Sequence, residues 1–318
     1  MGDIMKNYGL GWIKTANIDN FTSKTGIKLR RAIHKPLQIV LKLATKRKII
    51  VENYPKLEKG VPYIFASTHS FDEDIISNLA TIDRNAYVLI GTTDQLDFNP
   101  TMYAAWLNGL IYVDRLDKNS RQESLKKMEK IIKSGTSILM FPEGGWNNTE
   151  NLIVQNLFGG PYYLSKLTGA KVVPISAFNE MGSSKIYIRV GDPIDLSKYD
   201  KKDALIELRN SLATMRFNQM ELYSTPIERS KLSSDARLNF MEQRKNEYLR
   251  VNWSRDVWDE ELTVYKDKNC PSPEDIRKSI DDVVITKENA EIFAPILVKR
   301  LDDKKYDFKN YMHQNWNK

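Results

Sequence analysis

One histidine followed by three acids forms the stretch of this chain best suited to proton transfer. His69 comes directly after a run of strand-forming residues, and Asp72, Glu73 and Asp74 follow within five positions. A histidine can accept a proton near neutral pH, and a neighbouring carboxylate would fix its tautomer. The alternative is a polar turn residue ahead of a helix whose acidic first turn favours the positive end of the helix dipole. On the residues alone, any of the three acids could be the partner of His69.

Two further polar groups also lie two residues beyond the end of an apolar run. Arg115 follows one such run, and Glu143 with Gly144 and Gly145 follows another. In an α/β sheet the ligand site lies beyond the carboxyl ends of the strands, so these groups are expected at one edge with His69. An arginine can donate two parallel hydrogen bonds to a phosphate, and glycines let backbone amides approach an anion closely. The alternatives are a surface arginine at a strand end and a turn that binds no ligand.

Strands and helices alternate from residue 48 onward. Short runs rich in Ile, Val and aromatic residues predict strands, and residues 120–133 carry an apolar face at helical spacing. This alternation predicts an α/β domain with a largely parallel central sheet flanked by helices. The predicted strands are 48–51, 62–67, 86–90, 110–113, 137–141, 171–175 and 186–190, and the predicted helices are 72–81, 102–107, 120–133 and 162–167.

The beginning of the chain carries the excess positive charge. The formal net charge is +7, bases and acids nearly balance from residue 61 onward, and no acid occurs between Asp19 and Glu52. Apolar residues alternate with the bases at the spacing of amphipathic helices, interrupted near Pro36. Such a segment can lie on a membrane, where each base near anionic lipid contributes about 1 kcal/mol. A solvated helix packed on the body and a nucleic-acid-binding helix are the alternatives. The sequence has no zinc-finger or RNA-binding signature that would support a nucleic-acid-binding helix, so no nucleic-acid partner is expected.

Composition limits the remaining classes of function. A chain of 318 residues with 41% hydrophobic and 28% charged residues can bury a sizeable core in one large domain. Cys270 is the only cysteine and only three histidines occur, which excludes an intramolecular disulfide and argues against a His-rich metal site. No phosphate-binding or dinucleotide-binding glycine motif occurs, so no cofactor is expected. No secretory signal or spanning segment is visible, and we expect a cytoplasmic protein on the cytoplasmic face of a membrane.

Four motifs resemble those of the glycerolipid acyltransferases, the family typified by lysophosphatidic acid acyltransferase. The pattern H-x-x-x-x-D is matched by His69 and Asp74, and the second block ends at Arg115. The block F-P-E-G is matched by residues 141–144, and V-P-I by residues 173–175. The order and separations of these blocks agree with the family across roughly residues 48–195.

The resemblance implies transfer of an acyl chain from a thioester to a hydroxyl of a lysoglycerophospholipid, with 1-acylglycerol-3-phosphate favoured as the acceptor. His69 would act as general base, and Asp74 would hold its ring. The donor would be acyl-coenzyme A or an acyl carrier protein. The residues implied in substrate binding are Arg115, Glu143, Gly144, Gly145, Asn147 and Pro174.

The third block departs from the family after its first glycine. The family continues T-R-S, and here the chain reads Gly145-Trp146-Asn147. The missing arginine removes one phosphate ligand, and Asn147 resembles the E-G-x-x-N form of tafazzin-type transacylases. A phospholipid–lysophospholipid transacylase and a non-catalytic lipid-binding protein are therefore the alternative functions.

Three segments are expected along the chain. A basic amphipathic segment covers residues 1–47, the acyltransferase domain covers 48–220, and a helical extension covers 221–318. The resemblance does not extend into this last segment, where residues 228–251 read as a charged helix and Pro273 opens a further one. We expect the extension to pack its aromatic residues on the core, with partner binding as the alternative.

Overall fold

The computed structural model describes residues 23–91, 107–113, 117–147, 152–233 and 235–249. The chain divides into two compact units, Met1–Glu261 and Leu262–Lys318, and every described residue belongs to the first. Nearly all of the helix predicted over 102–107, and the helix predicted to open at Pro273, lie outside the described residues.

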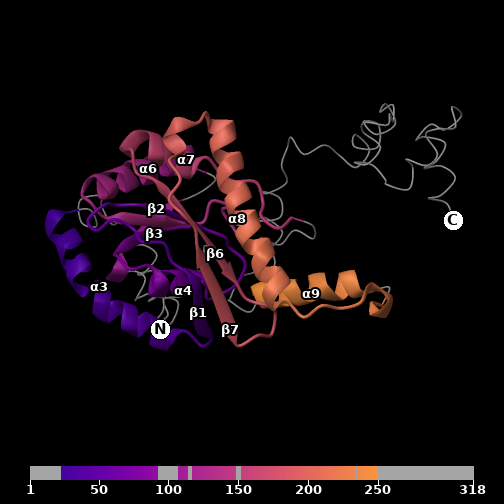
Figure 1. Ribbon diagram of the computed structural model, residues 1–318. Coiled ribbons are helices and arrows are strands. Elements are labelled where there is room, and N and C mark those ends of the chain that lie inside the picture. Colours follow the sequence, from indigo (N-terminus) through magenta and orange to yellow (C-terminus); the bar gives the residue numbers. More distant parts are fainter. Residues whose placement is uncertain (1–22, 92–106, 114–116, 148–151, 234, 250–318) are drawn as a thin grey trace, which may run out of the picture. The chain divides into compact units, whose positions relative to one another are not determined.

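A seven-stranded sheet occupies the centre of the first unit (Figure 1). Its strand order is β1-β7-β6-β2-β5-β3-β4. Every neighbouring pair is parallel except β6 and β7, so the predicted largely parallel α/β sheet is confirmed. The strands are β1 (Lys48–Asn53), β2 (Ile64–Ser67), β3 (Ala86–Gly91), β4 (Leu110–Val113), β5 (Ser137–Met140), β6 (Val172–Phe178) and β7 (Lys185–Val190).

Helices cover both faces of this sheet (Figure 1). The parallel pairing of strands separated in the sequence requires crossover connections, and helices supply them. Among the described residues, no helix is long and apolar enough to cross a membrane. The helices are α3 (Lys24–Ala44), α4 (Asp74–Thr81), α6 (Lys118–Lys133), α7 (Gly160–Thr168), α8 (Lys201–Tyr223) and α9 (Ala236–Leu249), with short 3-10 turns at Leu196–Lys198 and Arg229–Lys231.

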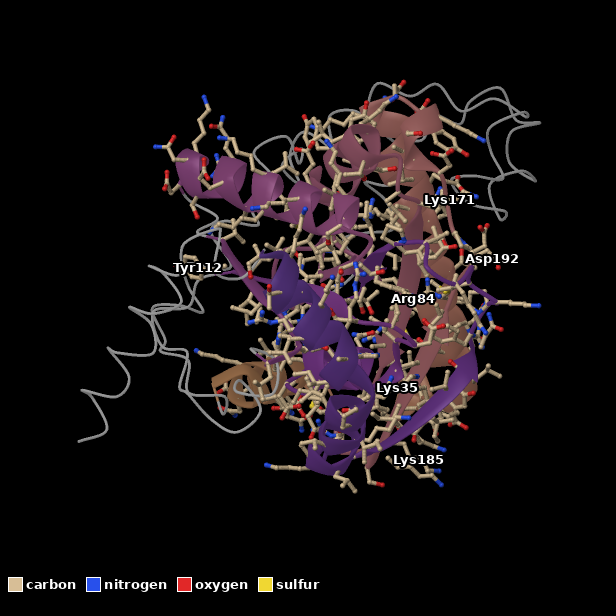
Figure 2. All side chains as sticks on the ribbon, turned by 90° about the vertical axis from the view of Figure 1, so that its left-hand side faces the viewer. Lys35, Arg84, Tyr112, Lys171, Lys185 and Asp192 are labelled. Carbon is tan, nitrogen blue, oxygen red and sulfur yellow. The ribbon has the colours of Figure 1, made fainter. Side chains whose placement is uncertain are left out.

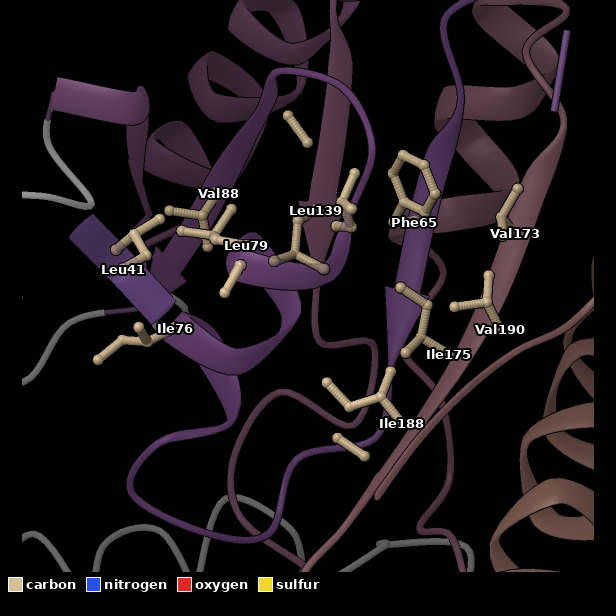
Figure 3. Packing of buried hydrophobic residues seen from close by; sticks show 14 of the residues in the cluster. Leu41, Phe65, Ile76, Leu79, Val88, Leu139, Val173, Ile175, Ile188 and Val190 are labelled. Carbon is tan, nitrogen blue, oxygen red and sulfur yellow. The ribbon is translucent and has the colours of Figure 1, made fainter. Parts of the chain in front are cut away.

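The central strands bury both of their faces, which is why they read as continuous apolar runs. Along β2, Phe65 enters the apolar cluster shared with α3 and α4, whereas Ile64 and Ala66 enter the cluster shared with α6, α7 and α8. In β5, Leu139 faces the first cluster (Figure 3). Successive side chains therefore serve opposite layers with the two-residue period of a strand.

Helix α3 packs on the body and passes through Pro36 without a break, so the prediction of separate helices interrupted there was wrong for the described residues. Leu37 and Leu41, which both follow the proline, are buried, and Gln38 Nε2 donates to the carbonyl oxygens of Ala80 at 3.0 Å and Ile82 at 2.8 Å. Figure 2 looks onto this side of the molecule. These tertiary contacts offset the roughly 3 kcal/mol that an interior proline costs.

The two last described helices differ from the expected boundaries. Helix α8 runs to Tyr223, through the boundary expected at residue 220. Helix α9 begins at Ala236 rather than near residue 228, so the predicted start of the charged helix was wrong. Asp235 precedes α9, and its carbonyl accepts the Asn239 amide at 2.9 Å. Serine and aspartate favour helix starts over helix interiors, and Ser233 and Asp235 interrupt the stretch that the charge pattern alone made continuous.

Two leucines of α3 test the docking of this helix. Leu41 is 1% exposed and Leu43 is 81% exposed. We expect Leu41→Ala to lower the free energy of unfolding by about 2–5 kcal/mol, because it leaves a cavity between α3 and the sheet. Leu43→Ala is the matched control and should change it by less than about 0.5 kcal/mol in the same urea titration. Equal effects of the two substitutions would contradict the observed docking.

Candidate active site

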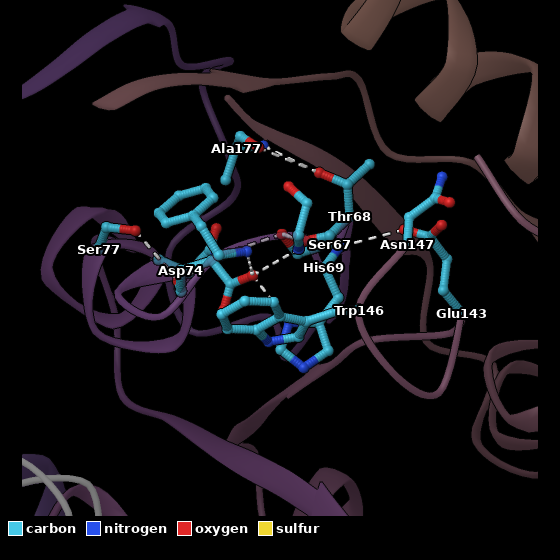
Figure 4. A network of polar contacts seen from close by, with 12 residues as sticks. Ser67, Thr68, His69, Asp74, Ser77, Glu143, Trp146, Asn147 and Ala177 are labelled. Carbon is cyan, nitrogen blue, oxygen red and sulfur yellow. Dashed lines mark hydrogen bonds and ion pairs between the residues drawn. The ribbon is translucent and has the colours of Figure 1, made fainter. Parts of the chain in front are cut away.

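The imidazole of His69 lies against the carboxylate of Asp74 at the carboxyl end of β2 (Figure 4). The distance from Nδ1 of His69 to Oδ2 of Asp74 is 2.7 Å. The same oxygen accepts the amides of Ser70 at 2.9 Å and Phe71 at 3.3 Å. The side chain of Asp74 is 1% exposed and that of His69 is 14% exposed. A buried carboxylate thus holds a partly accessible imidazole, as general-base catalysis requires.

The other two acids of this stretch have different partners. Arg47 donates to Oδ1 of Asp72 at 2.6 Å and to Oε2 of Glu73 at 2.9 Å, and the Lys46 amide donates to Oε1 of Glu73 at 2.7 Å. These contacts turn both acids toward the chain that follows α3. The geometry therefore selects Asp74 as the partner of His69, a choice that the residue types alone left open.

The start of α4 fixes the carboxylate. Asp74 is the first residue of the helix, and its carbonyl oxygen accepts Nδ2 of Asn78 at 2.7 Å. The same Nδ2 donates to Oγ of Ser67, the last residue of β2, at 3.0 Å. Asn78 is fully buried, so this tie between strand and helix is shielded from water.

Glu143 joins two loops rather than facing solvent. Its Oε1 accepts the His69 amide at 3.1 Å, and its Oε2 accepts the Gln155 amide at 2.9 Å. The side chain is 1% exposed, and burial raises the pKa of Glu143 to about 7, against the opposing effect of the two amides. This carboxylate sets the backbone of the His69 turn.

The loop after Glu143 forms a tight turn beside His69. Gly144 has a φ of 80°, which favours glycine, and its amide donates to the carbonyl of Phe141 at 2.9 Å. Gly145 is buried next to it. The Asn147 amide donates to the carbonyl of His69 at 2.7 Å, while its side-chain Nδ2 donates to the carbonyl of Leu152 at 2.8 Å. In this structure the Gly144 amide and the Asn147 side chain both bond within the protein.

Two aromatic rings flank the imidazole. The ring centroid of Phe141 lies 4.4 Å from that of His69, and the centroid of Trp146 lies 6.3 Å away in an edge-on arrangement. Trp146 is 5% exposed. The imidazole is therefore held on two sides by rigid apolar surfaces, which restrict its rotation.

Phe141 also lines an apolar cavity of about 400 Å³. The cavity lies between α6, α7 and the carboxyl ends of β3, β4 and β5, and Pro142 and Gly144 contribute to its wall. It thus begins at the motif turn that packs against His69. Its apolar lining includes Leu89, Val113, Met128, Met140, Phe141 and Phe158.

Two arginines at this site were not found from the sequence, because neither belongs to a motif. Arg216 of α8 donates from its second terminal nitrogen to Oγ of Ser70 at 3.0 Å. Arg244 of α9 donates to the carbonyl oxygens of Ser70 at 2.9 Å and Asn147 at 3.3 Å. Burial lowers the pKa of both guanidinium groups, to about 10 for Arg216, and the charge of Asp74 opposes the shift in each.

Two predicted site residues remain, Arg115 and Pro174. Arg115 lies outside the described residues. Pro174 is buried within β6, opposite Ala66 of β2, and its carbonyl accepts the Gly191 amide at 2.9 Å. The structure therefore brings together His69, Asp74, Glu143 and the turn at residues 144–147, and it keeps Pro174 inside the sheet. In the described part of the chain, no group of three or more His, Cys, Asp or Glu could hold a metal ion.

An α/β domain with a histidine–carboxylate pair at the carboxyl edge of its sheet is the class of protein defined by this geometry. Residues 48–177 match the family model described as Acyltransferase. This stretch is thus similar to acyltransferase-family domains, and the resemblance to the glycerolipid acyltransferases that the sequence indicated is confirmed.

Two plant proteins are similar to this chain. The chloroplastic 1-acyl-sn-glycerol-3-phosphate acyltransferase BAT2 of Brassica napus is 28% identical over 136 residues, which cover 43% of this chain and 37% of that protein. The chloroplastic 1-acyl-sn-glycerol-3-phosphate acyltransferase LPAT1 of Arabidopsis thaliana is 27% identical over 136 residues, which cover 43% of this chain and 36% of that protein. The chain thus spans little more than a third of the length of these relatives.

A solved structure is also similar. The crystal structure of the 1-acyl-sn-glycerophosphate (LPA) acyltransferase PlsC from Thermotoga maritima aligns with a TM-score of 0.48 and 18% identity, over 71% of this chain and 98% of that one.

The buried Glu143 should make stability depend on pH. Its folded-state pKa of about 7 lies above the ordinary value of 4.5, so the unfolded chain releases this proton first as pH rises. The buried carboxyl of Glu143 therefore contributes at most roughly 3 kcal/mol to the free energy of unfolding. This contribution is fully present below about pH 4.5 and is lost as the pH rises to about 7. We expect the free energy of unfolding to fall less over this range in Glu143→Gln than in the wild type. Parallel pH profiles from urea titrations would contradict the raised pKa.

Proposed function

We propose that this protein is an O-acyltransferase that moves a fatty acyl chain from an acyl thioester to a hydroxyl of a lysoglycerophospholipid. The observation that carries the proposal is the 2.7 Å contact between His69 Nδ1 and the buried Asp74 carboxylate, at the end of a strand in an acyltransferase-family domain. The names of the relatives favour 1-acylglycerol-3-phosphate as the acceptor.

The pair supplies one proton-transfer group to the reaction. With Nδ1 of His69 held by Asp74, the Nε2 atom takes the proton of the acceptor hydroxyl as its oxygen attacks the thioester carbonyl. The tetrahedral intermediate then collapses, the carbon–sulfur bond breaks, and the imidazolium returns the proton to the departing thiolate. The products are an ester and a free thiol. Asp74 stabilises the imidazolium that forms between the two proton transfers.

The apolar cavity supports a fatty acyl chain as the group transferred. Its volume of about 400 Å³ is within the range of small-molecule sites, and its lining is mostly aliphatic and aromatic. Phe141 belongs to the cavity wall and packs on the His69 ring, so a chain inside would bring its carbonyl end toward the imidazole. The donor thioester in this proposal is acyl-coenzyme A or an acyl carrier protein.

The acceptor headgroup is assigned to a residue of the second motif. Arg115 is proposed to bind the acceptor phosphate, as the resemblance implies, since a guanidinium pairs with phosphate through two hydrogen bonds. The third motif lacks the second arginine of the family, which keeps a phospholipid–lysophospholipid transacylase as the alternative. The two differ in the donor, which is a thioester in one and an intact phospholipid in the other.

We place the site of action on a membrane surface at the cytoplasmic face as part of this proposal, and helix α3 supports the membrane surface. Its buried residues and its exposed apolar residues lie on opposite sides of the helix at about 100° per residue. Lys28, Lys35 and Lys42 lie beside the exposed apolar stripe, and Lys35 is labelled in Figure 2. An apolar stripe flanked by lysines suits the interface of an anionic bilayer. The stripe consists of Leu29 at 61%, Ile39 at 60%, Val40 at 52% and Leu43 at 81% exposure.

A panel assay tests the proposed reaction. Purified protein is incubated with labelled acyl-coenzyme A or acyl carrier protein and a set of lysolipids, and we expect an esterified product from one acceptor class. His69→Ala and Asp74→Asn should each lower the rate by about 100-fold or more, since they remove the base or its charged partner. Asp72→Asn is the matched control, because it removes a carboxylate two residues away that binds Arg47 instead.

Other outcomes of the panel would redirect the assignment. Product from an intact phospholipid donor alone would identify a transacylase. Lipid binding without turnover by any donor would leave a non-catalytic lipid-binding protein. Equal losses in Asp72→Asn and Asp74→Asn would remove the specific role given to Asp74.

Vesicle binding tests the membrane surface proposed on α3. We expect Leu29→Asp and Leu43→Asp to weaken sedimentation with anionic phosphatidylglycerol vesicles, because each places a negative charge in the apolar stripe. Leu238→Asp is the control, since Leu238 is 65% exposed but belongs to α9. Uniform loss in all three variants, or none in any, would contradict a role for α3.

A further inference from the structure

A helix beyond the family-matched region contacts the two loops that hold His69. Residues 48–177 match the family model, whereas α9 spans Ala236–Leu249. One nitrogen of the Arg244 guanidinium donates to the carbonyl oxygens of both Ser70 and Asn147. Ser70 follows His69 directly, and Asn147 ends the turn that begins at Gly144. A single side chain therefore bridges the histidine turn and the glycine turn.

The bridge adds to contacts that already join these turns. The Asn147 amide donates to the His69 carbonyl at 2.7 Å, and Glu143 accepts the His69 amide at 3.1 Å. The guanidinium carbon of Arg244 also lies 5.8 Å from the ring centroid of Trp146, and the same indole lies edge-on to the imidazole. Cation–π contacts occur at this distance. Arg244 thus acts on the same imidazole through the backbone and through the indole.

The surroundings of Arg244 differ from those of a surface ion pair. Its side chain is 13% exposed, and its partner within the helix, Glu247, is 20% exposed at a distance of 3.6 Å. Exposed pairs contribute little because water screens them, whereas carbonyl oxygens that lose a buried charged donor keep their desolvation cost. Removal of the Arg244 guanidinium would therefore take this donor from the carbonyl oxygens of Ser70 and Asn147.

We propose that α9 completes the active site and that Arg244 is a positioning residue, which fixes the His69 turn against the turn at residues 144–147. This inference rests on the proposed acyl transfer for its kinetic consequence. Without the guanidinium, the two turns separate and Trp146 loosens, so the imidazole departs from the orientation in which proton transfer is fast. Misplacement of a catalytic group by about 1 Å can cost about 100-fold in rate.

Arg216 strengthens the same region from α8 but is a poorer subject for substitution. It donates to Oγ of Ser70 and to the carbonyl of Ala177, and it lies 4.8 Å from the ring of Phe178. Its removal would disturb the packing of α8 on β6 as well as the site. Arg244 reaches the site from a helix whose other residues are mostly exposed, so its effect can be separated from folding.

Three variants of the full chain test the proposal. Arg244→Ala removes the bridge, Arg244→Lys keeps the charge without the fork of donors, and Lys245→Ala removes the neighbouring cation on the same helix. With the donor and acceptor found active for the wild type, we expect kcat of Arg244→Ala to fall about 10- to 100-fold with little change in KM for the acceptor. Arg244→Lys should be intermediate, and Lys245→Ala should match the wild type.

Hydrogen–deuterium exchange gives a readout that does not depend on turnover. In Arg244→Ala, amides of residues 68–75 and 143–147 should exchange faster than in the wild type and in Lys245→Ala, while the central strands keep their protection. Unchanged exchange in both turns would overturn the proposal even if no substrate is found. An unchanged kcat, or a fall in kcat with global loss of protection, would also overturn it. A wild type inactive on every substrate would instead count against the proposed function.

Discussion

The burial of one carboxylate governs the geometry of this site. Asp74 has almost no contact with water, so its charge must be met by the His69 ring and by the amides of Ser70 and Phe71. Those amides converge only if the chain turns sharply between the end of β2 and the start of α4. The position of Asp74 at the first residue of a helix adds the favourable dipole at that end. The same constraint that folds the turn therefore orients the imidazole of His69.

The loops around this turn depend on one another through buried polar contacts. Glu143 connects His69 to Gln155, Asn147 returns a hydrogen bond to His69, and Arg244 bridges the two turns from α9. Removal of any one side chain would leave a buried polar group without its hydrogen-bond partner. The network therefore stabilises this arrangement of the loops more than the same hydrogen bonds would if they were independent. Phe141 both lines the apolar cavity and packs on the His69 ring, which belongs to this polar network. An amphipathic substrate with a headgroup and a hydrocarbon chain suits such a boundary.

Sequence patterns predicted the elements better than their ends. Strands such as β2 and β6 were predicted correctly because a continuous run of apolar residues indicates a strand that is buried on both faces. Such a run can be recognised from neighbouring residues alone. Pro36 was expected to break a helix, yet burial of Leu37 and Leu41 keeps α3 continuous. The start of α9 was placed too early, because charge pattern does not register the helix-starting preference of Ser233 and Asp235. Glu143 was assigned to ligands, whereas the structure uses both of its oxygens for the backbone.

The sequence by itself determined the α/β class, the largely parallel sheet and the positions of His69 and Glu143 after strand ends, because each follows from residues near one another in the chain. It left open which of three acids serves His69, and Arg47 decides this by binding Asp72 and Glu73. Only the tertiary structure could bring Arg216 and Arg244 to Ser70, across about half the length of the chain. Contacts at such separations are set by how helices pack on the sheet, and no local pattern of residue types encodes that packing.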